Sequence, residues 1–417
     1  MDAHEFTGLP LARVAEVFQA DAVERFTVDG QLAPKRRKPA ADVPFVSYNM
    51  PDNAYMTGIW LAAQAMRWDV TKDPDAQRVV KETIHGLDLL QHVTGVDGLL
   101  ARAAMRTDEP RQDDGTWRPS PDGRYVWRGD VSVDQMDGVF YGYLVAYDLA
   151  ADEADRRLIA ANVRALMDRL TQDDWRIYDV DRTPTRWGNY TPQYCHREPL
   201  NALLLLQHFA VAEHMTGDSR YAASRQALID QNGYLDFVRR ARQMADPTRR
   251  GGVNHSDDVL MLLAIDTVLR IEQDPTRREA YVASMRRMWE GADGWPGIGV
   301  ENNPPATFIV RRYVDPNVYV EPALETLRLF PLDMKWDDQT LGEYERRFGF
   351  RNRREPVSPP AAPGRVVPID RRPRSWSAWV ADPYEAGDRT APGGMEYNGH
   401  DFLWAYWMGR HYGFIGA

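Results

Sequence analysis

The sequence predicts an all-α protein: an (α/α) toroid or incomplete barrel of about six to seven helical hairpins, with long loops at one end. Apolar residues recur with helical spacing in many segments, and these segments come in pairs joined by short turns. The stretches between the pairs are long and rich in Pro, Gly, Asp, Arg and aromatic residues. We therefore expect a single toroid domain over residues 1–417, with its functional groups on the loops.

The helical segments and the loops alternate along the whole chain. Amphipathic helices are predicted near 54–69, 74–95, 132–149, 153–170, 197–216, 219–243, 255–273, 275–291, 316–330 and 400–411. Long loops are predicted at 99–131, 174–196, 292–315 and 350–398, the last a Pro-rich surface strap. Strand alternation is too weak for a separate β domain, although a small sheet within a loop is possible.

The turns inside the hairpins share one feature, an aspartate just before the second helix. These residues are Asp73, Asp152, Asp218 and Asp274. An aspartate in this position accepts hydrogen bonds from the unpaired N–H groups of the first helical turn. The unequal spacing of the four turns argues against a solenoid of fixed period and favours a closed ring. An open stack of helices is the competing architecture.

The composition excludes several function classes. The net charge is −10, which argues against a nucleic-acid partner, and no apolar run is long enough to span a membrane. Cys195 is the one cysteine, so a disulfide framework within the chain is impossible and a cysteine zinc site is not expected. We predict no cofactor and no metal. The N-terminus has no secretory signal, so a cytoplasmic location is expected, or a periplasmic or secreted one if a signal peptide has been removed.

The aromatic content and the missing motifs both favour a carbohydrate partner. The 13 tryptophans and 19 tyrosines could stack on sugar rings, although bulky filler between helices would explain them equally well. The chain contains no P-loop, dinucleotide-binding glycine pattern, HExxH, CxxC or GxSxG motif. Nucleotide, zinc-protease and serine-hydrolase functions are therefore not indicated.

The first candidate motif opens a strongly apolar helix with Asn254 and His255. An amide and an imidazole side by side can bind a substrate carboxylate and stabilise the charge that develops there. The alternative is a purely structural helix start, in which Ser256 or Asp257 caps the helix. We expect Asn254 and His255 to project into the central cleft as catalytic residues.

The second candidate motif follows 58 residues after His255 and contains Arg311, Arg312 and Tyr313. A positive neighbour favours the phenolate form of a tyrosine, which could then remove a proton next to a carboxylate. We expect Arg312 and Tyr313 to be catalytic and Arg311 to bind substrate, with Tyr319 as an alternative to Tyr313. Structural hydrogen bonds on a loop rim would also explain these residues.

The third candidate motif is the aromatic and basic start of the helix near 197. Tyr190, Tyr194, His196 and Arg197 are predicted to bind an anionic sugar, because cations and helix N-termini attract negative groups. The alternative is a solvated Arg197–Glu198 pair beside a packed histidine.

The fourth candidate motif spans the start of the helix predicted near 132 and contains Trp127 and three acids, Asp130, Asp134 and Asp137, of which Asp130 and Asp134 are favoured. We expect Trp127 and these two aspartates to bind substrate, and either aspartate could pair with Asp257 or Asp258 as general acid and base. Helix capping by Asp130 or Ser132 is the structural alternative, and calcium binding is not favoured because the twelve-residue calcium loop is absent. Segments 48–55 and 396–401 have the same polar, aromatic form and are expected to line the cleft.

The paired helices, the Asn254-His255 step and the downstream Arg-Tyr motif resemble the (α/α)-toroid polysaccharide lyases, such as alginate and glucuronan lyases. In those families an Asn–His pair neutralises a uronate carboxylate and a tyrosine transfers the proton. The chain also resembles six-hairpin glycosidase-like proteins. The resemblance implies a polysaccharide lyase that cleaves a uronic-acid glycan by β-elimination. Asp257 and Asp258 depart from the lyase pattern, so an inverting glycoside hydrolase is the alternative, with a non-catalytic glycan-binding protein as the third possibility.

Overall fold

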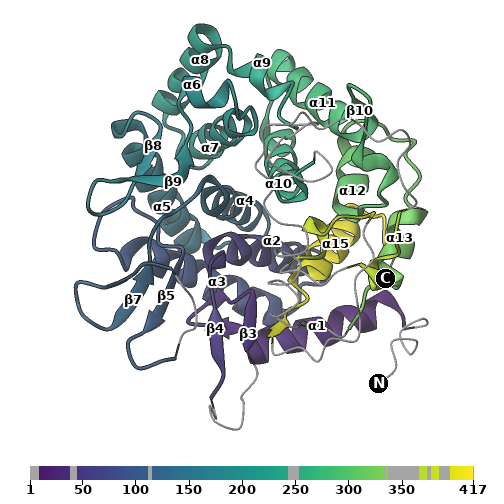
Figure 1. Ribbon diagram of the computed structural model, residues 1–417, viewed down its shortest axis with the longest axis horizontal. Helices are drawn as coiled ribbons and strands as arrows, with labels where there is room; N and C mark the ends of the chain where they lie inside the picture. Colours follow the sequence, from purple (N-terminus) through teal and green to yellow (C-terminus); the bar gives the residue numbers. More distant parts are fainter. Residues whose placement is uncertain are drawn as a thin grey trace, which may run out of the picture.

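The computed structural model describes residues 9–37, 45–110, 115–242, 253–332, 334–336, 366–372, 377–384 and 395–416, and the statements below concern these ranges. Most of the predicted strap at 350–398 lies outside them. The described residues contain six helices that form a closed inner ring, in which each helix contacts the next and the last returns to the first (Figure 1). The ring members are α2 (Asn53–Thr71), α4 (Val133–Leu149), α7 (Leu200–Thr216), α10 (His255–Ile271), α12 (Pro304–Tyr313) and α15 (His400–His411).

An outer helix packs on each inner helix and completes six pairs among the described residues. The outer helices are α3 (Pro74–His92), α5 (Glu153–Gln172), α8 (Ser219–Asn232), α11 (Pro275–Glu290), α13 (Glu321–Arg328) and α1 (Leu11–Arg25). Because α1 packs on α15, the two ends of the chain meet in the last pair. The predicted (α/α) toroid is confirmed.

The inner and outer helices differ in how much of their surface is apolar. Nearly every residue of α7 from Leu200 to Ala212 is buried, which is the pattern of a helix surrounded by protein. In α3 the buried residues recur at Ala76, Val79, Val80 and Thr83, which is a single stripe. The stripe faces the ring and the polar side faces solvent, so the sequence pattern alone separates the two layers.

The four predicted aspartate caps are confirmed. Asp73 accepts from the backbone N–H of Asp75 at 3.0 Å, and Asp152 accepts from Ala154 at 2.9 Å and from Asp155 at 3.0 Å. The other two caps follow the same rule, with Asp218 bonded to Arg220 at 3.0 Å and Asp274 to Arg277 at 2.9 Å. Each cap begins an outer helix and therefore fixes where the chain turns back.

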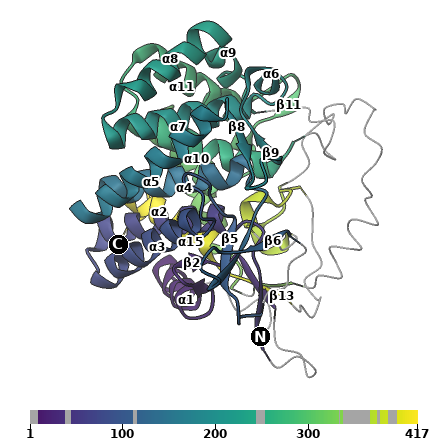
Figure 2. The same cartoon turned by 90° about the vertical axis from the view of Figure 1, so that its left-hand side faces the viewer.

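Short antiparallel strands occupy the loops that lead into the inner helices (Figure 2). The sheets are β1 (Thr27–Val28) with β2 (Gln31–Leu32); β12 (Lys335–Trp336), β13 (Met395–Tyr397), β3 (Lys35–Arg37) and β4 (Ser47–Asn49); β5 (Ala103–Arg106), β7 (Tyr125–Arg128) and β6 (Trp117–Pro119); β8 (Arg176–Tyr178) with β9 (Pro184–Asn189); and β10 (Gly291–Ala292) with β11 (Trp295–Pro296). Shorter helical turns are α6 (Pro192–Cys195), α9 (Tyr234–Val238), η1 (Ile298–Val300), η2 (Ile369–Arg371) and η3 (Ala378–Val380).

Two helices were not predicted from the sequence. The inner helix α12 lies in the predicted loop 292–315, where prolines and glycines hide it; Pro304 and Pro305 occupy its first turn, which tolerates proline. The outer helix α1 has only a narrow buried stripe that includes Val14, Phe18 and Ala22. The helix predicted over 316–330 is shorter, from Glu321 to Arg328.

The inner helices α2 and α4 touch backbone to backbone. A Cβ atom added to Gly58 would lie 1.9 Å from the carbonyl oxygen of Gly138, and one added to Gly142 would lie 2.4 Å from the carbonyl oxygen of Gly58. Such distances exclude any side chain larger than hydrogen. Because Gly58 and Gly138 are both the sixth residue of their helices, the contact also sets α2 and α4 at the same level.

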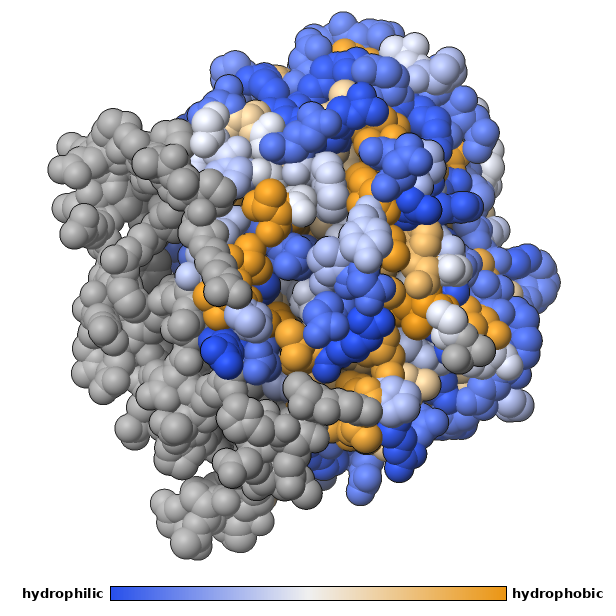
Figure 3. All heavy atoms as spheres, turned by 90° about the vertical axis from the view of Figure 1, so that its right-hand side faces the viewer, coloured by the Kyte–Doolittle hydropathy of each residue, from blue (hydrophilic) through white to orange (hydrophobic). Residues whose placement is uncertain are grey.

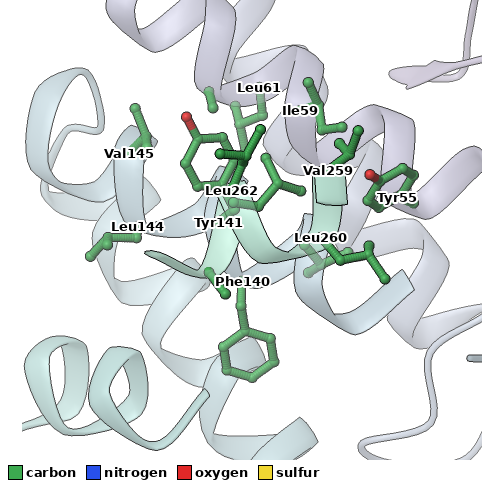
Figure 4. Close-up of a cluster of buried hydrophobic side chains, with 14 of the residues drawn as sticks. Tyr55, Ile59, Leu61, Phe140, Tyr141, Leu144, Val145, Val259, Leu260 and Leu262 are labelled. Atoms are coloured by element: carbon green, nitrogen blue, oxygen red, sulfur yellow. The ribbon is translucent and has the colours of Figure 1, made fainter. Parts of the chain in front are cut away.

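Side chains of α2, α4 and α10 fill the centre of the ring (Figure 4). Ile59 of α2, Tyr141 of α4 and Leu262 of α10 are each at most 2 % exposed. The centre of the ring is therefore a packed core and not a pore, and Tyr55 lies at the edge of this core in Figure 4.

Apolar residues also reach the surface. Figure 3 shows them in groups among polar side chains on the face that lies to the right in Figure 1. Among the described residues the most exposed large apolar one is Tyr319, at 74 %, in the turn between α12 and α13. No helix within the described ranges is long and apolar enough to cross a membrane.

Gly58→Ala should lower the free energy of unfolding by about 1–3 kcal/mol, because the new methyl group would press on the backbone of α4. Chemical denaturation measures the change. Gly409→Ala in α15 is the control, since its Cβ would meet the ends of flexible side chains such as Ile415. Equal losses in the two variants would contradict the backbone contact.

Candidate active site

The N-terminal ends of α2, α4, α7, α10, α12 and α15 lie together on the side of the ring that carries the strands, and we call this end the ring mouth (Figures 1 and 2). Helix N-termini carry partial positive charge and unpaired N–H groups, so six of them at one end stabilise negative groups. Acidic side chains are indeed frequent there. The ring mouth is thus the best place among the described residues for a polar ligand.

The pKa of Tyr55 is affected by acidic residues from three inner helices at the ring mouth. Burial raises the pKa of Tyr55 well above its usual value, and the carboxylates of Asp137, Asp134, Asp52 and Asp257 raise it further. Asp134 begins α4 and Asp257 begins α10, and both are half-buried. Two partly exposed carboxyl groups from different helices therefore both raise the pKa of the Tyr55 hydroxyl.

Asp137 lies one turn below Asp134 and has no exposed surface. Burial raises the pKa of Asp137 well above its usual value; a hydrogen bond from Gln207 opposes this, and Asp134 adds to it. Among the described residues, the two carboxyl oxygens of Asp137 form no hydrogen bond of normal geometry, and the same is true of the amide oxygen Oε1 of Gln207. If Asp137 is protonated, its O–H group can donate a hydrogen bond to that amide oxygen, so both residues gain a partner.

A buried ion-pair cluster stands on the α10 side of the ring mouth. Arg242 binds Asp258 with two hydrogen bonds, from Nε to Oδ1 at 2.7 Å and from Nη2 to Oδ2 at 2.8 Å. His255 Nδ1 lies 3.2 Å from Asp258 Oδ2, and Glu301 Oε1 lies 3.5 Å from Arg242 Nη2. We call these four residues the Arg242 cluster.

The charged groups of the Arg242 cluster shift one another's pKa values. Burial would raise the pKa of Asp258, but Arg242 and His255 outweigh it and lower that pKa to about 2. Burial would lower the pKa of His255, but Asp258 and Glu301 outweigh it and raise that pKa. Burial raises the pKa of Glu301, against the opposing effect of the two cations. Asp258 is therefore ionised and locked in place at neutral pH.

The same cluster contains the group of described residues whose spacing could suit a metal ion. The ligand atoms of His255, Asp258 and Glu301 lie within 4.8 Å of one another. Arg242 already occupies both carboxylate oxygens of Asp258, so a cation would compete with the guanidinium and be repelled by it. The arrangement fits an ion-pair network better than a metal site.

The structure places Asn254 and His255 at the ring mouth, as predicted. Asn254 itself caps α10 by accepting from the N–H of Ser256 at 3.2 Å, so neither Ser256 nor Asp257 is the cap. A small pocket beside the cap is lined by Ala241, Arg242, Asn254, Asp257 and Asp258.

The predicted combination of Asn254 and His255 with Tyr313 is wrong. Tyr313 ends α12, and its hydroxyl lies 3.1 Å from that of Tyr412, which in turn accepts from Arg270 at 2.6 Å. Arg270 is the penultimate residue of α10, roughly 22 Å along the helix from His255 at 1.5 Å per residue. Tyr313 therefore lies at the opposite end of the ring from His255.

Arg311 and Arg312 share this position at the far end of α12. Arg311 donates to the carbonyl oxygen of Val318 at 3.2 Å, and the Arg312 guanidinium lies 5.9 Å from the centre of the Tyr313 ring. Burial raises the pKa of Tyr313 to about 12, so the phenolate is disfavoured. The error came from treating 292–315 as a loop, since the helix carries these residues away from the ring mouth.

Two predicted substrate-binding residues belong to the interior. Tyr190 is fully buried, with its hydroxyl 3.0 Å from Nε2 of His208. Trp127 is 2 % exposed and packs under the guanidinium of Arg118 at 5.6 Å from the ring centre. A ligand cannot reach either side chain without moving the core.

Tyr194, His196 and Arg197, the other residues of the third motif, are at least partly exposed and so within reach of a ligand. Tyr194 is half-buried, and its pKa, raised mainly by burial, is also affected by Asp257 at the ring mouth. His196 and Arg197 are exposed, and His196 lies edge-on to Phe237. Substrate binding by these three residues stays a prediction.

Asp130 has a structural task. Its carboxylate accepts from the backbone N–H of Arg186 at 2.8 Å, and its own N–H donates to Asp179 at 3.1 Å. Its φ of 57° is uncommon outside glycine but tolerated by aspartate. Asp130 therefore joins the loop before α4 to the β8–β9 hairpin.

Asp137 is the third acid of the fourth motif, but the sequence analysis favoured Asp130 and Asp134 over it. Sequence reasoning missed Arg242 and Glu301. Arg242 lies 16 residues before Asp258 and Glu301 follows η1, and no local pattern marks either residue. Tyr55 falls in segment 48–55, which was expected to line the cleft.

Comparisons with known proteins give structural neighbours only. No family model matches the chain, and no curated protein matches its sequence. One similar solved structure is an unsaturated glucuronyl hydrolase specific for heparin, at 11 % identity and a TM-score of 0.46, over 96 % of this chain and 95 % of that one. Another is the GH76A α-1,6-mannanase from Salegentibacter sp. HEL1_6, at 11 % identity and a TM-score of 0.45, over 98 % and 100 %.

A third similar structure is a metagenome-derived family 9 endoglucanase, at 14 % identity and a TM-score of 0.41, over 87 % of this chain and 70 % of that one. The ring of helix pairs in the present chain is established by its own helix contacts.

Asp137→Asn should change the free energy of unfolding by less than about 1.5 kcal/mol, because it exchanges one neutral group for another of the same size. Asp137→Leu should cost more, about 1–3 kcal/mol beyond that value, because Gln207 would lose its partner. Denaturation of both variants at pH 7 tests the pair. A larger loss for Asp137→Asn than for Asp137→Leu would mean that Asp137 is ionised.

His255→Gln should cost stability mainly at low pH. The pKa of His255 is raised in the folded state, so its stabilisation is complete below its unfolded value of about 6.5 and is lost as the pH rises through the folded value. Unfolding free energies of wild type and variant, measured from about pH 5.5 to pH 9, should therefore converge towards high pH. A difference that stays constant or grows with pH would contradict the cluster.

Proposed function

We propose that the protein is a glycoside hydrolase that cleaves a glycan at the ring mouth, with Asp134 and Asp257 as its general acid and base. One observation carries the proposal: these two half-buried carboxyl groups lie in the first turns of α4 and α10, two inner helices that pack together, and both raise the pKa of Tyr55. Most glycoside hydrolases use a pair of carboxyl groups, one on each side of the glycosidic bond that is cleaved.

Asp130 and Asp258, the other candidates for the acid–base pair, are less suited to proton transfer. Asp130 is engaged by the backbone of Arg186, and Asp258 is held by Arg242 and His255. A catalytic carboxyl group must be able to exchange a proton with the substrate or with water. Asp134 and Asp257 meet this need through their partial exposure.

The surroundings support different roles for the two residues. Asp257 shares a pocket with Arg242, a cation that favours a carboxylate, which suits the base. Asp134 lies one turn above the buried Asp137, whose raised pKa favours its neutral form, and we assign Asp134 as the acid. The base would activate a water molecule while the acid protonates the leaving oxygen.

Hydrolysis is favoured over β-elimination because the lyase hypothesis needs a tyrosine base near His255. Tyr313 is at the far end of the ring. Burial raises the pKa of Tyr194, which Asp257 influences, and of Tyr384, which Arg242 and Glu301 influence; both tyrosines are half-buried. A raised pKa weakens a tyrosine as a proton acceptor at neutral pH, because less phenolate is present.

The test is a panel of neutral and acidic polysaccharides, with reducing ends and ultraviolet absorbance measured in parallel. We expect new reducing ends without the absorbance of an unsaturated uronide. Asp134→Asn and Asp257→Asn should each lower kcat by about 10²–10⁴-fold, which is the usual contribution of acid–base catalysis.

Asp130→Asn and Tyr313→Phe are the matched controls and should keep most of the activity. Products that absorb in the ultraviolet, together with loss of activity in Tyr313→Phe, would overturn the proposal in favour of a lyase.

The anomer of the first product provides an independent check. We propose the inverting mechanism, in which the base activates a water molecule that attacks the sugar on the face opposite the leaving group. Proton NMR during the first minutes of cleavage should show the inverted anomer. Retention of configuration would contradict this assignment of the base.

A further inference from the structure

The β8–β9 hairpin stands next to the ring mouth and is held there by a specific bond. Strand β9 contacts α4, and the backbone N–H of Arg186 donates to Asp130 at 2.8 Å. Asp130 lies four residues before Asp134, so the hairpin is fixed beside the helix start that carries the proposed acid. The side chains of Arg186 and Trp187 both belong to this strand.

Trp187 is exposed to solvent to an extent that is unusual for a tryptophan. Its exposed fraction is 50 %, and it is the only tryptophan among the large exposed apolar residues that the structure describes. Other tryptophans, such as Trp60 and Trp404, are fully buried in the core. Leaving an indole in water forgoes the stabilisation that its burial would supply. A flat apolar ring beside a ligand site is suited to stacking on a sugar.

The guanidinium of Arg186 packs against the ring of Trp187. Its central carbon lies 4.8 Å from the centre of that ring, and Arg186 forms no ion pair with any described residue. The same hairpin contains a matched arrangement, in which Arg182 lies 4.7 Å from the centre of the Tyr178 ring. Arg182 differs because it is paired with Asp173 at 2.7 Å.

We propose that Trp187 and Arg186 form a binding subsite for an acidic sugar unit of the glycan. The indole stacks on the apolar face of the sugar ring, and the guanidinium binds its acid group, either a carboxylate or a sulfate ester. The subsite rests on the proposed hydrolase function of the neighbouring ring mouth, and it goes further by assigning an acidic class of substrate. The net charge of −10 does not prevent this, since a local cation governs a local contact.

The proposal is tested by binding, in the Asp134→Asn background so that the ligand is not cleaved. Isothermal titration would use oligosaccharides of three kinds: uronic-acid, sulfated neutral-sugar and unmodified neutral chains. Arg186→Gln should weaken binding of the acidic ligand about tenfold or more and leave the neutral one unchanged, because a charged hydrogen bond is lost. Trp187→Ala should weaken every ligand that binds.

Arg182→Gln is the matched control, since it removes a stacked arginine from the same hairpin, and it should leave all affinities unchanged. The carboxylate and sulfate arms identify which acid group is bound. The subsite is overturned if Arg186→Gln behaves like Arg182→Gln, if it weakens the neutral ligand equally, or if no oligosaccharide binds. A protein that binds acidic chains as described, but whose wild type cleaves none of them, would instead contradict only the hydrolase proposal.

Discussion

The backbone contact between α2 and α4 is the constraint on which the rest of the ring mouth depends. Gly58, Gly138 and Gly142 let the two helices approach until only hydrogen atoms separate their backbones. The contact fixes the two helices at one level, so that Tyr55 and Asp134, near the starts of their helices, come together. The third helix, α10, packs against α4, and its Leu262 lies in the same buried cluster as side chains of α2 (Figure 4). The geometry of the acids is thus set by packing well below them.

The electrostatics of the ring mouth follow from how each acid is compensated. Asp258 is ionised because Arg242 and His255 stabilise its charge, and removal of one partner of such a buried pair is costly. Burial raises the pKa of Asp137 well above its usual value, which favours its neutral, protonated form. The two fully buried acids therefore differ in charge at neutral pH. Asp134 and Asp257 are half-buried, and we propose them as the groups that exchange protons with a substrate.

The fold could be predicted from the sequence because its signals are local. Each aspartate cap, such as Asp152, acts within three residues, and the helical spacing of apolar residues acts within one helix. The site could be predicted only in part. Asn254 and His255 lie at a helix start that the sequence marks, whereas Tyr313 was misplaced because a ten-residue helix that begins with two prolines has no clear signal. Arg242 pairs with Asp258 across 16 residues of chain, and no local pattern marks that pairing.

The most direct test of the account is the crystal structure of Asp134→Asn with an oligosaccharide that the wild-type protein cleaves. The account predicts that the scissile oxygen lies between residue 134 and Asp257, within hydrogen-bonding reach of the acid position, with an acidic sugar unit against Trp187. A sugar chain bound at the opposite end of the ring, near Tyr313 and Tyr412, would contradict the central claim that the ring mouth is the active site.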